Sequence, residues 1–164
     1  MVRLRRFAAG AVACATLALG IGGTANAADP AASTPAARQA VTLTAPSAPV
    51  GVQNFGPTAT SPYTSPASTA GHVNPGQTYT CEYAYLCELA WDPTTGNWEL
   101  FKQARCNLYH VYYWNGDGYL WNNQTRGTQS TFLGSGDKTV LWRNTAPSPQ
   151  TSAYWDPVYS FRNC

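Results

Sequence analysis

The chain has 164 residues, with ten Lys and Arg against eight Asp and Glu, and five cysteines. Three of the arginines lie within the first six residues, so the chain from Ala28 onward carries seven basic and eight acidic residues and is nearly neutral. A nearly neutral chain has no broad basic surface for a polyanion, which excludes nucleic acid and anionic lipid as expected partners.

Residues 1–27 have the three parts of a bacterial-type signal peptide. The early arginines form the positive region, residues 7–20 form an apolar run, and Ala25-Asn26-Ala27 gives the small-x-small pattern cleaved before Ala28. The apolar run is shorter than the about 20 residues that a membrane-spanning helix needs. We therefore predict a secreted, extracellular protein that keeps no membrane anchor after cleavage.

Residues 28–76 differ in composition from residues 77–164. Of these 49 residues, 35 are Ala, Pro, Thr, Ser or Gly, eight are proline, and only Asp29 and Arg38 are charged. Such a composition disfavours a packed core, so we interpret the segment as an extended tether or pro-segment. Val50–Phe55 is the exception, because it has the composition of a strand that could join the folded domain.

Residues 77–164 are predicted to form the folded domain. They contain all six tryptophans, nine of the ten tyrosines and three of the five phenylalanines. Asp92–Gly96, Asn115–Gly118 and Gly134–Asp137 are turn sequences between short runs typical of strands. Residues 109–114 alternate with a period of two, and no segment has a helical period. The runs predict strands at 83–91, 98–101, 109–114, 119–121, 128–133, 138–143 and 158–162. The expected fold is an all-β, small Greek-key sandwich.

Four cysteines remain after cleavage, and an even number in a small exported domain favours disulfides. Four cysteines allow three pairings, which the sequence does not distinguish. We favour Cys81–Cys87, which closes a tight local loop, and Cys106–Cys164, which ties the last residue to the middle of the domain.

A metal site is not expected from the cysteines. Cys81-x5-Cys87 lacks the CxxC spacing of a zinc knuckle, and only His72 and His110 could complete such a site. We therefore predict no metal and no cofactor.

Several short motifs succeed one another between residues 79 and 142. They are Cys81-x5-Cys87, the aromatic Trp91 followed by Gly96, Cys106 leading to Trp114-Asn115-Gly116, and Trp121-Asn122-Asn123-Gln124-Thr125. This arrangement resembles secreted bacterial domains of the βγ-crystallin-like superfamily, especially those grouped with the microbial metalloproteinase inhibitors. The resemblance implies a crystallin-like sandwich and a protease-inhibitor function. It does not extend to calcium binding, because Arg126 stands in the stretch where calcium-binding members carry Ser or Thr.

An enzyme is not expected. The predicted domain contains one histidine, His110, and no spacing fixes two of its carboxylates at a catalytic separation. In the alternating strand His110 shares a face with Tyr112 and Trp114, and adjacent Tyr112 and Tyr113 should point to opposite faces of the sheet.

We therefore predict a monomeric binding module. The leading function is protease inhibition, with an extracellular protease as partner. The alternatives are a carbohydrate or cell-wall binding module, with a cell-wall glycan as partner, and an extracellular structural domain. Glycan rings stack on exposed aromatic side chains. The candidate binding residues for that role surround the Asn115–Gly118 turn and are Tyr112, Trp114, Tyr119 and Trp121.

Overall fold

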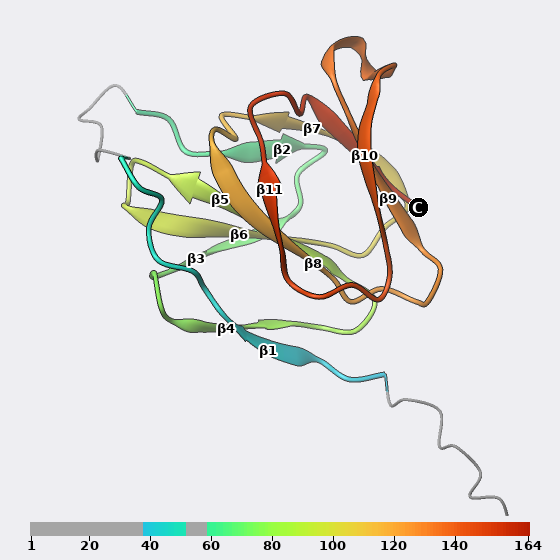
Figure 1. Ribbon diagram of the computed structural model, residues 1–164, viewed down its shortest axis with the longest axis horizontal. Helices are drawn as coiled ribbons and strands as arrows, with labels where there is room; N and C mark the ends of the chain where they lie inside the picture. The colour runs from blue at the N-terminus through green and yellow to red at the C-terminus, as the bar shows by residue number, and fades with distance from the viewer. Residues whose placement is uncertain (1–37, 52–58) are drawn as a thin grey trace, which may run out of the picture. The chain divides into compact units, whose positions relative to one another are not determined.

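The computed structural model describes residues 38–51 and 59–164, which form two five-stranded antiparallel sheets and a two-stranded ribbon (Figure 1). Sheet I has the order β10-β9-β12-β7-β2 and contains β2 (Tyr63–Ser65), β7 (Asn107–Tyr112), β9 (Gln129–Leu133), β10 (Val140–Thr145) and β12 (Ser160–Asn163). Sheet II has the order β11-β8-β5-β6-β3 and contains β3 (Thr69–Val73), β5 (Leu86–Asp92), β6 (Asn97–Gln103), β8 (Asp117–Asn122) and β11 (Thr151–Tyr154). The ribbon pairs β1 (Val41–Thr44) with β4 (Thr78–Cys81).

The predicted fold class is confirmed: the sheets form an all-β sandwich with two disulfides. Cys81 is bonded to Cys87 and Cys106 to Cys164, with Cα atoms 6.0 and 4.6 Å apart. Both favoured pairings are therefore present, and such bonds are typical of an oxidising compartment. A search of the described residues finds no helix with the length and apolarity to cross a membrane.

The interior of the sandwich is built from aromatic side chains of both sheets. Trp114 lies near its centre, with its ring 4.6 Å from Phe101, 5.0 Å from Trp155 and 6.0 Å from Phe161. Aromatic rings each remove a large apolar area from water, so a few of them fill the space between two small sheets. The buried members of this core are Leu86, Ala90, Phe101, Tyr109, Trp114, Leu120, Phe132, Ala153, Trp155, Val158 and Phe161.

The outer face of sheet II is covered by the ribbon and by the residues that follow β1. Trp98 is fully buried there, and its indole Nε1 donates a hydrogen bond of 3.0 Å to the carbonyl of Pro46. Ala45 is 1% exposed and its backbone N–H donates to the carbonyl of Gln77 at 2.8 Å. Every residue of β5 is consequently buried, because this strand has a packed layer on each side.

The folded unit therefore begins before residue 77, where the sequence analysis placed its boundary. β1, β2 and β3 lie in the predicted tether and pair with β4, β7 and β6. Ala45 and Val73 of this segment are buried in the outer core, and Leu43 packs against it. Val50 and Gly51 form a turn, while the remainder of the predicted 50–55 strand lies outside the described residues, as does the predicted signal peptide.

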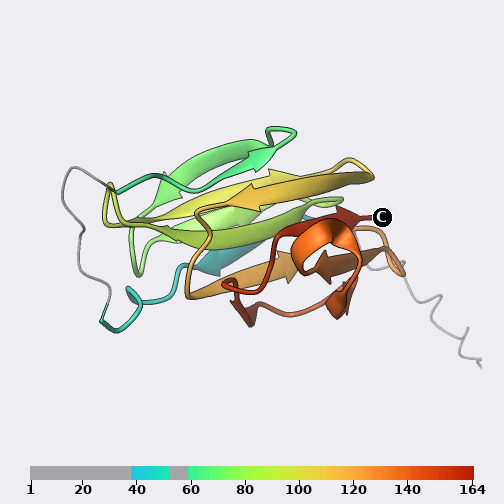
Figure 2. The ribbon, with the colours of Figure 1, turned by 90° about the horizontal axis from the view of Figure 1, so that it is seen from above.

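The short 3-10 turn η1 (Ser135–Asp137) lies beside β12 (Figure 2). The Ser160 hydroxyl on β12 donates a hydrogen bond of 2.5 Å to Asp137 Oδ1. This contact fixes the Asp137 carboxylate beside β7, which pairs with β12.

Candidate functional site

Exposed tyrosines gather at the end of sheet I where β2 pairs with β7. Tyr63 lies opposite Tyr112 in the register, and their rings are stacked with centroids 4.6 Å apart. The Tyr113 ring lies 6.1 Å from that of Tyr63. Tyr112, Tyr113 and Tyr159 line one cleft, and Tyr63 lies next to it through its contact with Tyr112. These four side chains, which we call the tyrosine cluster, are each between 41% and 55% exposed.

The cleft beside the tyrosine cluster has a volume of about 460 Å³. It is lined by His110, Val111, Tyr112, Tyr113, Gly136, Asp137 and Tyr159. The Nδ1 atom of His110 lies 3.7 Å from Asp137 Oδ1, and both side chains remain partly exposed. The cleft therefore combines aromatic rings with an imidazole and a carboxylate.

The backbone at Tyr113 explains why adjacent tyrosines share this cleft. β7 ends at Tyr112, and Tyr113 has a φ of 60°, in the left-handed region. This conformation ends the strict alternation of a strand, so Tyr112 and Tyr113 are both exposed on the cleft side. The prediction that they point to opposite faces is wrong for this reason.

The same turn directs Trp114 into the core, where it is only 3% exposed. Trp114 is therefore not available as a surface binding residue. Tyr119 and Trp121 lie on β8 in sheet II and pack against the covered outer core, where the Tyr119 ring is 5.7 Å from Trp98. Of the four predicted binding residues, the cleft contains only Tyr112.

Sequence reasoning missed Tyr63, Tyr113 and Tyr159 as members of the site. Tyr63 was a usable signal, since it is the only aromatic residue of the low-complexity segment besides Phe55. Its position opposite Tyr112 depends on the pairing of β2 with β7, two strands more than 40 residues apart in the chain. No local pattern indicates that pairing.

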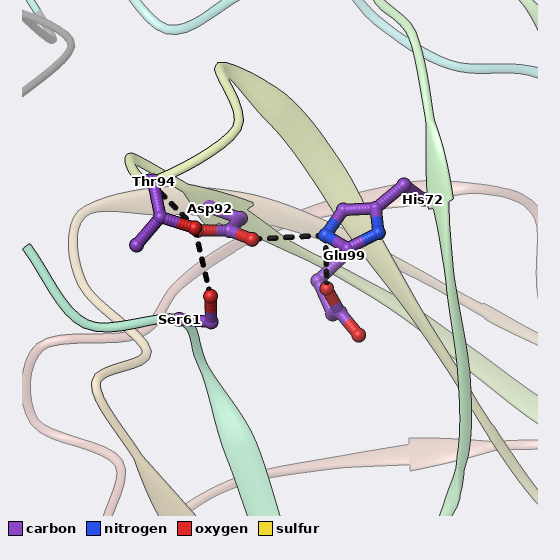
Figure 3. Close-up of polar contacts among 5 residues, drawn as sticks. All are labelled: Ser61, His72, Asp92, Thr94 and Glu99. Atoms are coloured by element: carbon purple, nitrogen blue, oxygen red, sulfur yellow. Dashed lines mark hydrogen bonds and ion pairs between the residues drawn. The ribbon is translucent and has the colours of Figure 1, made fainter.

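A second polar cluster lies in sheet II at the end of β5 and contains His72, Asp92 and Glu99 (Figure 3). The Nε2 atom of His72 is 2.9 Å from Asp92 Oδ2 and 2.7 Å from Glu99 Oε2. Asp92 is fully buried and Glu99 nearly so, whereas His72 is exposed. From the sequence, His72 is expected to lie in the tether and is a candidate ligand only together with the cysteines.

The two carboxyls of this cluster have pKa values displaced in opposite directions. Burial acts to raise the pKa of Asp92, but hydrogen bonds from Thr94 and His72 outweigh it and hold the pKa below its usual value. Burial raises the pKa of Glu99; the nearby His72 opposes this effect and the Asp92 charge adds to it. The pair thus places one stably ionised carboxylate beside one that holds its proton more readily.

Comparison of the chain with protein-family models, with curated proteins and with solved structures found no match. The resemblance to βγ-crystallin-like inhibitors therefore rests on the short motifs of the sequence alone.

Proposed function

We propose that the protein is an exported binding module that holds a glycan chain in the cleft beside the tyrosine cluster. The observation that carries this proposal is the stacked, solvent-exposed pair Tyr63 and Tyr112 next to the polar pair His110 and Asp137. A sugar ring has an apolar C–H face and a rim of hydroxyls, so it needs an aromatic surface with hydrogen-bonding groups at its edge.

The size and charge of the site support a neutral, polar ligand. A volume of about 460 Å³ falls within the ~300–1,000 Å³ typical of ligand sites. Asp137 accepts hydrogen bonds from hydroxyls, and His110 donates or accepts according to its tautomer. The near-neutral charge of the chain from Ala28 onward gives no attraction to a polyanion.

Export is part of the same proposal. The two disulfides persist in an oxidising compartment, and the arginines, apolar run and Ala25-Asn26-Ala27 pattern at the start of the chain match a cleaved leader. A cell-wall glycan would be within reach of a protein delivered to that compartment.

Protease inhibition receives less support from the fold. An inhibitor presents a rigid, protruding loop to a protease cleft. The disulfide-closed Glu82–Tyr85 loop is half-buried. Two backbone hydrogen bonds hold it to Asn123: the Ala84 N–H donates to the Asn123 carbonyl at 2.9 Å, and the Asn123 N–H donates to the Tyr85 carbonyl at 3.0 Å. The glycan cleft is therefore the better candidate, and protease binding becomes the competing outcome of the test.

The test measures retention of the protein, residues 28–164 with both disulfides formed, on insoluble peptidoglycan, chitin and cellulose. We expect retention on at least one of them and a roughly two- to tenfold weaker affinity for Tyr112→Ala and Tyr63→Ala, because each removes a stacking ring worth about 0.5–1.5 kcal/mol. Tyr154→Ala is the matched control, since Tyr154 is as exposed as Tyr159 but lies on β11 in the other sheet.

A parallel inhibition assay uses a panel of secreted metallo- and serine proteases. Equal retention of the wild type and both tyrosine variants would contradict the cleft proposal. Stoichiometric inhibition of a protease with no glycan retention would replace it by the inhibitor function.

A further inference from the structure

Three metal-ligating side chains converge from three neighbouring strands of sheet II. His72 on β3 lies directly opposite Glu99 on β6 in the register. β6 pairs with β5 along its other edge, where Ala90 lies opposite Glu99. Asp92 is the last residue of β5, two positions beyond Ala90. Residues that are opposite or diagonal across a sheet lie close enough for their side chains to meet. The register alone therefore places the three ligand atoms together (Figure 3).

The cluster brings two buried carboxyl groups to a single imidazole nitrogen. The Nε2 atom of His72 carries at most one hydrogen, yet it lies within 3 Å of one oxygen from each of two carboxylates. Among the described residues, His72 is the only basic side chain paired with either carboxylate. A divalent cation placed between the two buried carboxyl groups would bring positive charge to both of their oxygens at once.

The carboxylate of Asp92 is oriented by neighbours that leave one oxygen for the site. Its Oδ1 atom accepts hydrogen bonds from the Thr94 backbone N–H at 2.8 Å and from the Thr94 hydroxyl at 2.7 Å. The Thr94 hydroxyl is in turn 2.8 Å from the hydroxyl of Ser61. The Oδ2 atom of Asp92 points at His72 (Figure 3). Outer hydrogen bonds that fix a ligand in this way are typical of metal centres.

We propose that His72, Asp92 and Glu99 form a binding site for a divalent transition-metal ion, with Zn²⁺ as the best fit. One imidazole nitrogen and two carboxylate oxygens suit zinc. Calcium prefers six to eight oxygens and is disfavoured by the nitrogen. The three protein ligands leave a further position for water or a ligand group, on the side where His72 meets solvent.

The geometry requires a small movement to admit the ion. Zinc bonds of about 2.0–2.2 Å separate tetrahedral donor atoms by roughly 3.3 Å. The His72 nitrogen must therefore retreat by about half an ångström from each carboxylate oxygen. His72 can do so because its side chain is exposed on β3, the edge strand of sheet II. The ion would then tie this edge strand to β5 and β6.

The experiment titrates Zn²⁺ into chelator-treated, desalted protein, residues 28–164, by isothermal titration calorimetry at pH 7.5. We expect one equivalent of Zn²⁺ to bind and the midpoint of thermal unfolding to rise with zinc concentration, because the ion binds the folded state. The same titration with Ca²⁺ should show at least tenfold weaker binding.

Variants separate this site from adventitious binding. His72→Gln and Glu99→Gln should each weaken zinc binding by at least tenfold, and Thr94→Ala, which removes no ligand atom, by about ten- to a hundredfold. His110→Gln is the matched control, since it removes the other described histidine beside a carboxylate and should leave zinc binding unchanged. Near-UV circular dichroism without metal confirms that each variant is folded.

The proposal is overturned if the wild-type protein binds no stoichiometric Zn²⁺, if both His72→Gln and Thr94→Ala bind as tightly as the wild type, or if His110→Gln alone abolishes binding. The result is independent of the glycan proposal, because the stacked pair Tyr63 and Tyr112 lies on β2 and β7 of sheet I. Tyr112→Ala should therefore leave zinc binding unchanged.

Discussion

Gly118 on β8 lies directly against the indole ring of the buried Trp155. The indole Nε1 donates a hydrogen bond of 3.0 Å to the carbonyl of Leu89 on the neighbouring strand. A Cβ atom at Gly118 would lie 1.8 Å from that indole nitrogen and 2.3 Å from the Leu89 oxygen. The absence of a side chain at this residue is thus a condition for burying Trp155.

We predict that Gly118→Ala lowers the free energy of unfolding by about 2–4 kcal/mol, because it overpacks the core and separates a buried hydrogen-bonded pair. Urea unfolding followed by tryptophan fluorescence measures the change. Gly71→Ala on β3 is the control, since nothing lies within 4 Å of its Cβ position and its φ is ordinary. Equal stability of the two variants would show that the indole does not depend on Gly118.

Glu88 is a fully buried carboxyl on β5 whose two oxygens have no hydrogen-bond partner among the described residues. Burial raises its pKa well above the usual value, although the nearby Gln103 side chain opposes this effect. The folded protein therefore keeps a proton that the unfolded chain releases above about pH 4.3.

We predict that Glu88 makes the protein less stable as the pH rises from 5 to 8. The unfolded state binds fewer protons in this window, so the free energy of unfolding falls until the pH passes the raised pKa of the folded state. Glu88→Gln removes the titration, and the fall should be smaller in urea unfolding at pH 5 and pH 8. Glu82→Gln, a change at a half-buried carboxylate beside Lys102, should keep the wild-type fall. Identical pH dependence in wild type and Glu88→Gln would refute the prediction.

At the scale of strands, the sequence predicted most elements and missed those that lack a strong pattern. Alternating aromatic runs located β5 to β10 and β12 to within a few residues. Residues 83–85 are a turn instead of strand, because Ala84 has a φ of 72° inside the disulfide-closed loop. β11 was missed because it is short and follows a proline-containing loop.

The metal-ligating cluster shows why site prediction is harder than strand prediction. Asp92 and Glu99 flank a hairpin that the sequence identified, so their proximity was foreseeable. The third member, His72, was not, because β3 lies in a segment of Ala, Pro, Ser, Thr and Gly and is held by its pairing with β6. The composition of the whole segment is an average, so it does not reveal one short strand within it. β3 is such a strand, and its partner β6 supplies the buried apolar side chains.

For the whole molecule, the residues before 77 complete the outer core of sheet II. Ala45 is buried in the same cluster as Trp98, whose indole donates a hydrogen bond to the Pro46 carbonyl, and Leu43 of β1 packs against this cluster. Without them, large apolar side chains on the outer face of sheet II would meet water.

We predict that a fragment of residues 77–164 is less stable than residues 38–164 by at least about 3 kcal/mol, since several large side chains lose burial worth about 1.5–3 kcal/mol each. Urea unfolding of both fragments measures the difference, and binding of a hydrophobic dye reports the uncovered face. Equal midpoints and equal dye binding would restore the interpretation of this segment as a tether.

The position of β12 in sheet I also determines when the protein can fold. β12 lies between β9 and β7, and these two strands have no direct pairing with each other. A chain that emerges N-terminus first, from a ribosome or a membrane pore, must therefore wait for residues 160–163 before sheet I can close. The strands that β12 pairs with, β7 and β9, are also distant from it in the sequence, and such long-range pairings slow folding. Until β12 is in place, β7 with β2 and β9 with β10 remain two separate pairs of strands, so the closing of sheet I is a late step in the folding of this domain.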